Sequence, residues 1–151
     1  NRTDYIKRLI GAPGDIVQFV NGEIFINDKA LNREKIIFSN EIRCGLSNLT
    51  VNAYKETLPN GKSYTAVYSK NNTMQNTDKY IVPKDHYFLL GDNRDCSKDS
   101  RFLSSVGYVN KSNLVGKAKI IFFSNDTKKG SLLKFWNWKN SFRFNRIFKK
   151  I

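Results

Sequence analysis

Short segments that alternate apolar and polar residues dominate this chain and predict a protein built mainly from β-strands. Residues 15–27 form two apolar runs joined by Asn21-Gly22, and a second Asn-Gly pair, Asn60-Gly61, lies between two other alternating segments. Such a pair is a strong hairpin signal, because the favoured two-residue turn needs positive φ at both positions. We therefore expect two β-hairpins centred on these pairs.

Three further segments predict strands of one central sheet: DYIKRLI (4–10), HYFLLGD (86–92) and LVGKAKIIFFS (114–124). Between residues 32 and 82 the chain is richer in Asn, Lys and Thr and its periodicity is weaker, which indicates an inserted, irregular β subdomain. The predicted fold class is mainly β and antiparallel. Its predicted parts are a central β core (1–15 and 83–125), an inserted β subdomain (16–82) and a basic aromatic C-terminal segment (126–151).

The C-terminal segment interleaves aromatic and basic residues. Its aromatic residues include Phe135, Trp136, Trp138, Phe142, Phe144 and Phe148. This pattern is typical of membrane interfaces and of nucleic-acid-binding surfaces. An amphipathic segment that packs on the core is an equally good interpretation.

Composition narrows the class of partner. The 151 residues suit one domain, or one domain with a sizeable insertion, and 26 Lys and Arg against 13 Asp and Glu give a net charge of +13. Such a surface suits an anionic partner, either nucleic acid or phospholipid headgroups. No run reaches the roughly 18 apolar residues of a membrane span. The chain enters a predicted strand at once and without an initiating Met, so we expect a piece of a longer protein.

The metal-binding residue types are sparse. Cys44 and Cys96 are too few for a disulfide framework or a metal cluster, and whether they are oxidised stays open. His86 lies in a strand-like run, where a structural role is favoured over ligation. We expect neither a metal nor another cofactor.

Lys7 is the first residue that suggests chemistry. Alternation along its strand places Tyr5 and Leu9 on the same face, and Ile6 and Arg8 on the other. Burial penalises a charged ammonium group, so a covered Lys7 could act as a general base in its neutral form. The alternative is a lysine that snorkels at the edge of a sheet.

A dense alternation of acids and bases, GDNRDCSKDSR (91–101), directly follows the apolar run HYFLL. A solvated loop does not need this pattern. Together with KRLIGAPGD (7–15), in this order, the segment resembles the lysine box and the C-terminal box of the type I signal peptidases. These are membrane-bound Ser/Lys proteases that remove signal peptides from exported proteins. The resemblance covers most of the chain outside residues 32–80.

The resemblance implies a role for each matched residue. Lys7 would be the general base, and the Ser97 hydroxyl would orient its amine. The remaining charged residues would form ion pairs that brace the two boxes against each other: Arg8, Asp92, Arg94, Asp99 and Arg101. Paired charges are tolerated beside a core, whereas unpaired ones there cost several kcal/mol. Cys96 stands where the family often has Asn.

One departure concerns the nucleophile. The family places its catalytic serine in a Ser-Met box upstream of the lysine box, whereas this sequence has one methionine, Met74, preceded by Thr73. We therefore expect the serine and the membrane anchor to be absent from this chain, and the chain alone to be inactive. By resemblance the substrates are preprotein signal peptides, and the site is the outer face of the cytoplasmic membrane at the lipid surface, with no nucleic acid.

Two alternatives stay open. A self-cleaving Ser/Lys protease of the repressor type would share the lysine base and the β fold, but would lack the GDNRD cluster. A basic β-barrel that binds nucleic acid would use the positive charge, and would show aromatic and basic residues together on one sheet face.

Overall fold

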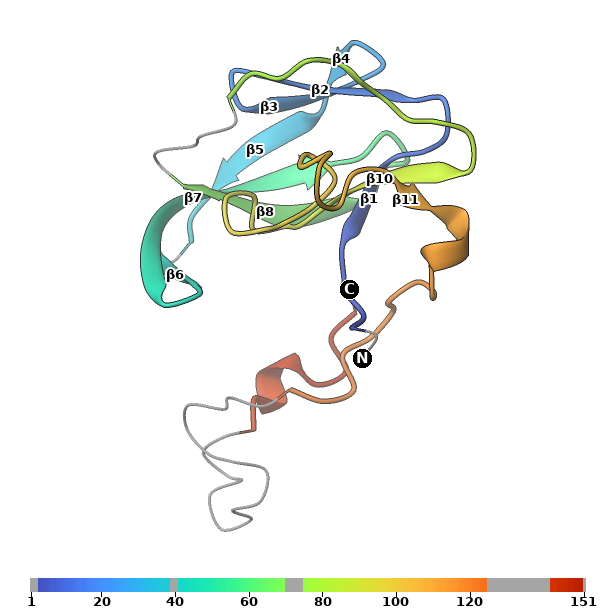
Figure 1. Cartoon of the computed structure of the whole chain (residues 1–151). Coiled ribbons are helices and arrows are strands. Elements are labelled where there is room, and N and C mark those ends of the chain that lie inside the picture. Colours follow the sequence, from blue (N-terminus) through green and yellow to red (C-terminus); the bar gives the residue numbers. More distant parts are fainter. Residues whose placement is uncertain (1–2, 39–40, 70–74, 125–141, 151) are drawn as a thin grey trace. The chain divides into compact units, whose positions relative to one another are not determined.

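The computed structural model describes residues 3–38, 41–69, 75–124 and 142–150, and its architecture is mainly β (Figure 1). The chain divides into two compact units, Asn1–Leu114 and Val115–Ile151. The first unit contains β1 (Arg8–Gly11), β2 (Ile16–Val20), β3 (Glu23–Ile26), β4 (Lys29–Ala30), β5 (Asn32–Ile36), β6 (Glu41–Cys44), β7 (Ser47–Thr57), β8 (Ser63–Ser69), β9 (Tyr80–Ile81), β10 (His86–Leu90), β11 (Val109–Asn110) and the 3-10 helix η1 (Lys111–Asn113). The second contains the 3-10 helix η3 (Phe144–Arg146).

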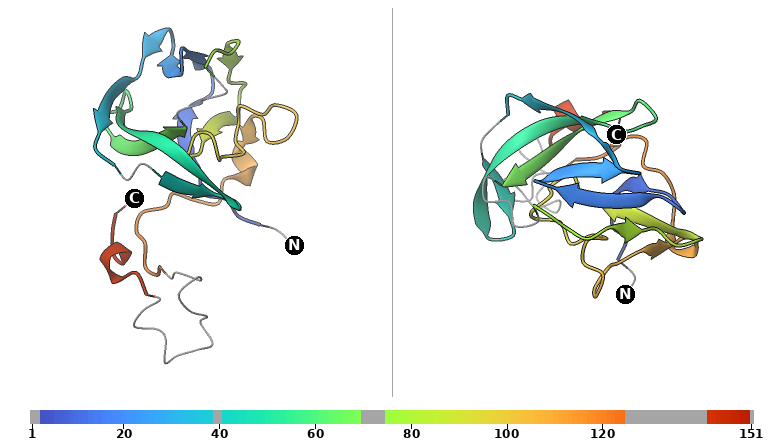
Figure 2. Two further views of the ribbon diagram at one scale, coloured as in Figure 1. Left: turned by 90° about the vertical axis from the view of Figure 1, so that its left-hand side faces the viewer. Right: turned by 90° about the horizontal axis from the view of Figure 1, so that it is seen from above.

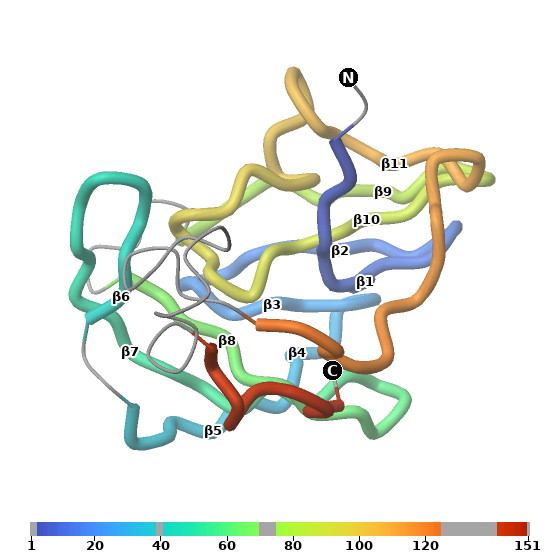
Figure 3. The backbone as a smooth tube through the Cα atoms, turned by 90° about the horizontal axis from the view of Figure 1, so that it is seen from below, coloured from blue at the N-terminus to red at the C-terminus, as the bar shows by residue number. Residues whose placement is uncertain are grey.

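The strands of the first unit form antiparallel sheets. Their orders are β1-β10-β11, β4-β3-β2-β9 and β5-β7-β6, with β8 paired to β7. The chain enters along β1 and passes through a short turn directly into β2 (Figure 3). The mainly β, antiparallel prediction is therefore confirmed.

Both predicted hairpins form. Asn21 and Gly22 join β2 to β3 with φ of 49° and 75°, the positive values that this tight turn requires. Asn60 and Gly61 lie in the connection from β7 to β8, where Gly61 has a φ of 79° and donates its N–H to the Leu58 carbonyl at 2.9 Å. The turn residues thus fix the register of both strand pairs.

The polar middle of the chain builds longer strands than its weak periodicity suggests. β7 runs for 11 residues and pairs with β5, β6 and β8 (Figure 2). Its two faces contact different clusters: Val51 and Ala53 pack with Val67, while Tyr54 packs against the main core. A strand that is covered on both faces loses the simple alternation by which strands are recognised.

The main core lies between the β2–β3 hairpin, β8 and β10. Its side chains with the lowest exposure include Val17, Phe19, Val82, Phe88 and Leu90, each no more than 1% exposed. Burial of these side chains is the main stabilisation of the unit. It also fixes β10, and therefore the segment that follows it.

Two strand predictions are wrong. The N-terminal strand begins at Arg8 rather than at residue 4. Residues 114–124 form no strand and make one isolated bridge, Ile120 to Lys150. Their side chains stay largely exposed, with Val115 at 75% and Phe122 at 80%, because no strand in the described ranges pairs with them. A strand pattern without a partner ladder does not form a sheet.

The predicted aromatic tail is described only in part. Phe135, Trp136 and Trp138 lie outside the described residues. The ring of Phe142 stacks on Phe144 with centroids 5.6 Å apart. Phe144 and Phe148 are 66% and 75% exposed. Within the ranges that the structure describes, no helix has the length and apolar character needed to cross a bilayer.

Candidate active site

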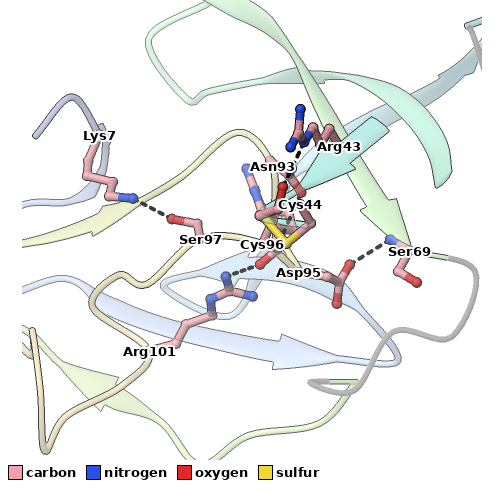
Figure 4. The surroundings of a disulfide bond; sticks show 11 residues. Lys7, Arg43, Cys44, Ser69, Asn93, Asp95, Cys96, Ser97 and Arg101 are labelled. Carbon is pink, nitrogen blue, oxygen red and sulfur yellow. Dashed lines mark hydrogen bonds between the residues drawn. A yellow bond between two sulfur atoms is a disulfide. The ribbon is translucent and has the colours of Figure 1, made fainter. Parts of the chain in front are cut away.

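The two boxes meet at Lys7 and Ser97. The Lys7 Nζ donates a hydrogen bond to the Ser97 Oγ at 2.6 Å, across 90 residues of sequence (Figure 4). β1 pairs antiparallel with β10, with Arg8 opposite Leu90, so Lys7 lies opposite Gly91. Both side chains are half-buried. The sheet register therefore brings an amine and a hydroxyl together.

Gly91 makes the space for this contact. A Cβ added there would lie 2.1 Å from the Ser97 Oγ, 2.3 Å from the Ser97 Cβ and 3.5 Å from the Lys7 Nζ. Any side chain at Gly91 would displace the serine hydroxyl. The glycine is needed for this close approach rather than for a special φ.

Arg8 and Asp92 join the two boxes next to this contact. The guanidinium donates from Nε and Nη2 to the two carboxylate oxygens at 2.7 and 2.8 Å, and it stacks 3.9 Å above the centre of the Tyr64 ring. The hydrogen bond to Asp92 raises the pKa of Arg8, against the opposing effect of burial. A bidentate pair of this kind holds orientation as well as charge.

Asp99 and Arg101 fold the C-terminal box back onto itself. Arg101 donates to both Asp99 oxygens, at 2.8 and 2.9 Å, and also to the Arg94 carbonyl. Asp99 in turn accepts the Gly91 N–H at 3.0 Å. All of these groups are buried. The pair thus fixes the backbone at the glycine that faces Ser97.

Arg94 points in a different direction from the one expected. It is 1% exposed, and its guanidinium donates to Glu56 at 2.7 Å, to the Tyr68 hydroxyl at 2.8 Å and to the Tyr64 hydroxyl at 3.1 Å. Both tyrosines also donate to Glu56. Arg94 therefore ties the box to β7 and β8 instead of bracing it against the lysine box.

Burial is the main cause that raises the pKa of both tyrosine hydroxyls, and the neighbouring Glu56 carboxylate raises them further against the opposing effect of Arg94. The pKa of Arg94 is also raised: burial opposes this, but Tyr68 and Glu56 outweigh it. The cluster is therefore one buried cation, one acid and two neutral hydroxyls.

Glu56, Tyr64 and Tyr68 were not predicted from the sequence as partners of the C-terminal box. A usable signal was present, because Glu56 shares one face of β7 with Tyr54 by period-two alternation, and Tyr54 packs on the core. An acid on an apolar face predicts a buried basic partner.

The two cysteines form a disulfide, which the sequence left open. Cys44, at the end of β6, bonds to Cys96, which directly precedes Ser97, and the two Cα atoms are 5.5 Å apart. In addition, the Asp95 carboxylate accepts the Ser69 N–H at 2.6 Å, and Asn93 forms a parallel bridge with Val67. The box is thus attached at several points to the sheet of β5–β8.

The face that carries Lys7 is open. Tyr5 is 79% exposed and Leu9 is 44% exposed, so the two residues expected beside Lys7 do not cover it within the described structure. In β1-β10-β11, β1 is the edge strand. An amine that is oriented from behind by a hydroxyl and open in front can exchange a proton with a second hydroxyl.

Ser100 and His86 make hydrogen bonds elsewhere than at the Lys7–Ser97 contact. Ser100 is buried, and its hydroxyl accepts the Leu89 N–H at 2.9 Å, which places it in the strand pairing of β10. His86 contacts the Lys84 carbonyl. Among the described residues, no group of three or more His, Cys, Asp or Glu is arranged to hold a metal ion.

Comparison with known proteins identifies similar chains. A family model described as signal peptidase, peptidase S26, matches residues 1–123. The signal peptidase I of Rickettsia bellii (strain OSU 85-389) is 42% identical over 166 residues, which cover 99% of this chain and 55% of that protein. The signal peptidase I of Rickettsia conorii is 42% identical over 164 residues, with coverage of 97% and 59%. The chain spans little more than half the length of these curated relatives.

A solved structure is also similar. A signal peptidase I from Enterococcus faecalis is 25% identical, with 73% of this chain and 78% of that chain covered and a TM-score of 0.37.

Proposed function

This chain belongs to the peptidase S26 family of signal peptidases, and we propose that it is the part of a signal peptidase I that supplies the general base. The observation that carries the proposal is the 2.6 Å contact between the Lys7 amine and the Ser97 hydroxyl, at the junction of the two matched boxes. No cofactor enters the proposed reaction.

In the proposed reaction Lys7 acts in its neutral form. Its amine takes the proton of a serine hydroxyl, and that serine attacks the carbonyl carbon of the scissile peptide bond. The proton then passes to the leaving amine as the C–N bond breaks. An acyl-enzyme forms and is hydrolysed by water. The nucleophile would come from outside these 151 residues, since the chain contains no Ser-Met pair.

Ser97 suits the role of orienting group. A hydroxyl holds the amine by a hydrogen bond in either protonation state, whereas a carboxylate at the same place would favour the charged ammonium and oppose base catalysis. The Arg8–Asp92 pair and the buried Asp99–Arg101 pair support this arrangement from behind.

The proposed substrates are signal peptides of exported preproteins. An extended peptide can add to the free edge of a sheet, and β1, which directly follows Lys7, is such an edge in the described structure. The exposed Tyr5 and Leu9 side chains offer shallow apolar contacts along it.

We also propose that the protein works at the outer face of the cytoplasmic membrane. The net charge of +13 and the aromatic and basic residues of 126–151 favour an anionic lipid surface. Binding to anionic vesicles should fall with added salt and on deletion of residues 131–151, while zwitterionic vesicles should bind weakly. Equal binding by the truncated chain would contradict this assignment. Salt-sensitive RNA binding without vesicle binding would favour the nucleic-acid alternative.

The catalytic proposal is tested in a longer chain that carries the upstream segment with the serine. Lys7→Met should abolish preprotein cleavage and leave the fold intact, while Ser97→Ala should retain more activity, because the loss of one hydrogen bond costs about 1 kcal/mol or a little more. Lys29→Met, at an exposed position of β4, is the matched control. More than a few per cent of activity in Lys7→Met would refute Lys7 as the base.

The short chain provides a second test. We expect residues 1–151 alone to cleave nothing, because the base then has no hydroxyl to deprotonate. Cleavage by the repurified short chain, lost on Lys7→Met, would show that a serine within these residues is the nucleophile.

A further inference from the structure

Ser97 lies in a short stretch that the sheets do not hold. Two backbone hydrogen bonds to neighbouring strands flank this stretch. On one side the Arg94 N–H donates to the Val67 carbonyl at 2.9 Å, and on the other the Ser100 N–H donates to the Leu89 carbonyl at 3.0 Å. Between them the described structure gives one backbone amide bond, from Cys96 to the Asn93 side chain at 3.3 Å. Residues 95–98 therefore depend on side chains for their position.

The disulfide is the covalent attachment of this stretch. Cys96 directly precedes Ser97, and its partner Cys44 ends β6, where it pairs with Ser47 in the β6–β7 hairpin. Figure 4 shows the Cys44–Cys96 bond on one side of Ser97 and the Lys7 amine on the other. Within residues 95–98, two links lead to the sheet of β5–β8: this disulfide, next to Ser97, and the hydrogen bond from the Ser69 N–H to the Asp95 carboxylate at 2.6 Å.

The contact made by Ser97 tolerates little movement. Its Oγ is 2.6 Å from the Lys7 Nζ, and it sits against Gly91, where even a methyl group would overlap it. A hydrogen bond weakens steeply once its donor and acceptor separate beyond about 3.2 Å. A backbone shift of less than 1 Å at residue 96 is therefore enough to lose the contact.

We propose that Cys44 and Cys96 are positioning residues, which hold Ser97 against Lys7 only while they are joined. A dithiol reductant such as dithiothreitol would pass two electrons and two protons to the bridge, so that the S–S bond breaks, two thiols form and the reagent closes to a cyclic disulfide. Residues 95–98 would then loosen while both sheets persist. The catalytic consequence rests on the proposed function, but the structural one does not.

The structural consequence is measured on the 151-residue chain by hydrogen exchange. The Cys96 backbone amide, which donates the hydrogen bond of this stretch, should exchange about tenfold faster or more after reduction, since the bridge then no longer restricts local opening. Amides of β7 and β8 should keep their rates. Acylation of Lys7, followed by peptide mapping, should also accelerate, while the exposed Lys29 should react at an unchanged rate.

Cys44→Ser is the matched control variant. It should show the fast exchange of the reduced chain from the outset and should not respond to dithiothreitol. Unchanged exchange at Cys96 on reduction would overturn the proposal. Faster exchange throughout Asn1–Leu114 would also overturn it, because the bridge would then be a general support rather than a positioning device.

The catalytic consequence is measured on the longer chain. Reduction should lower kcat about five- to twentyfold, as expected for the loss of one orienting hydrogen bond, and leave KM unchanged. Reoxidation should restore kcat, except in Cys44→Ser. Local loosening with an unchanged kcat would refute the positioning role. An oxidised longer chain that cleaves no preprotein would refute the proposed function instead, and the exchange experiment would still decide the structural claim.

Discussion

Replacement of Glu56 by Gln removes one charge from the buried cluster and keeps the side-chain shape. The Glu56 and Arg94 side chains are 2% and 0% exposed and lie 2.7 Å apart. In Glu56→Gln the guanidinium keeps its charge, because Arg is not deprotonated in proteins. It would then be a buried cation whose described neighbours are two neutral tyrosines.

The magnitude follows from this burial. Removal of one partner of a buried ion pair costs about 3–5 kcal/mol, most of it from the uncompensated charge that remains. Domains of this size have unfolding free energies of about 5–15 kcal/mol. We expect Glu56→Gln to lower Tm by about 10–20 °C.

The assay is urea and thermal unfolding of the 151-residue chain, followed by circular dichroism. Asp28→Asn is the matched control: it makes the same carboxylate-to-amide change in a pair with Lys79, where the side chains are 68% and 48% exposed. Such a surface pair contributes about 0–1 kcal/mol. Addition of Arg94→Gln to Glu56→Gln should recover stability, since no buried charge is then left.

A loss below about 1 kcal/mol in Glu56→Gln would refute this reasoning, because the tyrosine hydroxyls and water would then satisfy the guanidinium alone. A double variant less stable than Glu56→Gln would show that packing, rather than charge, sets the cost.

Three other predictions concern the same region. The pKa values of Tyr64 and Tyr68 are raised above their ordinary value of 10.0 in the folded chain, so as pH rises these hydroxyls lose their protons in the unfolded chain first. Tm should therefore not depend on these groups below about pH 10 and should fall above it. The fall should be less steep in Tyr68→Phe. Gly91→Ala should lower preprotein cleavage by the longer chain at least as much as Ser97→Ala, because the new methyl group displaces the Ser97 hydroxyl and also lies 3.5 Å from the Lys7 Nζ, whereas Ala at Gly116, which meets nothing within 4 Å, should be neutral in the same assay. Asp92→Asn should lower the unfolding free energy by about 1 kcal/mol or less, since the Asp92 side chain is 44% exposed. A loss above about 3 kcal/mol in urea titration would show that this pair contributes as much as a buried ion pair, and would contradict the prediction.

Local sequence signals predicted the local structure well. The Asn-Gly pairs set both hairpins because positive φ is a property of the turn residues themselves. The contact between Lys7 and Ser97 was also predicted, but it came from a family resemblance between two distant motifs. The alternation of apolar and polar residues in the two segments does not show that Lys7 and Ser97 meet.

Properties that depend on a distant partner could not be read from the chain. Residues 114–124 have a strand pattern but no ladder partner, and the pairing of Cys44 with Cys96 depends on how β6 approaches the box. Arg94 looked like its charged neighbours, and only the position of β7 and β8 shows that it is a core residue.

The sequence separation of 90 positions between Lys7 and Ser97 has a consequence for the order of events in synthesis. In a chain made from its N-terminus the lysine comes first, and the serine and Asp92 come only after β2–β10 have been made. Contacts of such high sequence separation form late, since the loop between them must first be closed at an entropic cost. We therefore expect the unfinished chain to carry a mobile, solvated lysine. The Lys7 amine becomes ordered only when the segment that carries Ser97 has been added, so assembly itself delays any activity that depends on this contact.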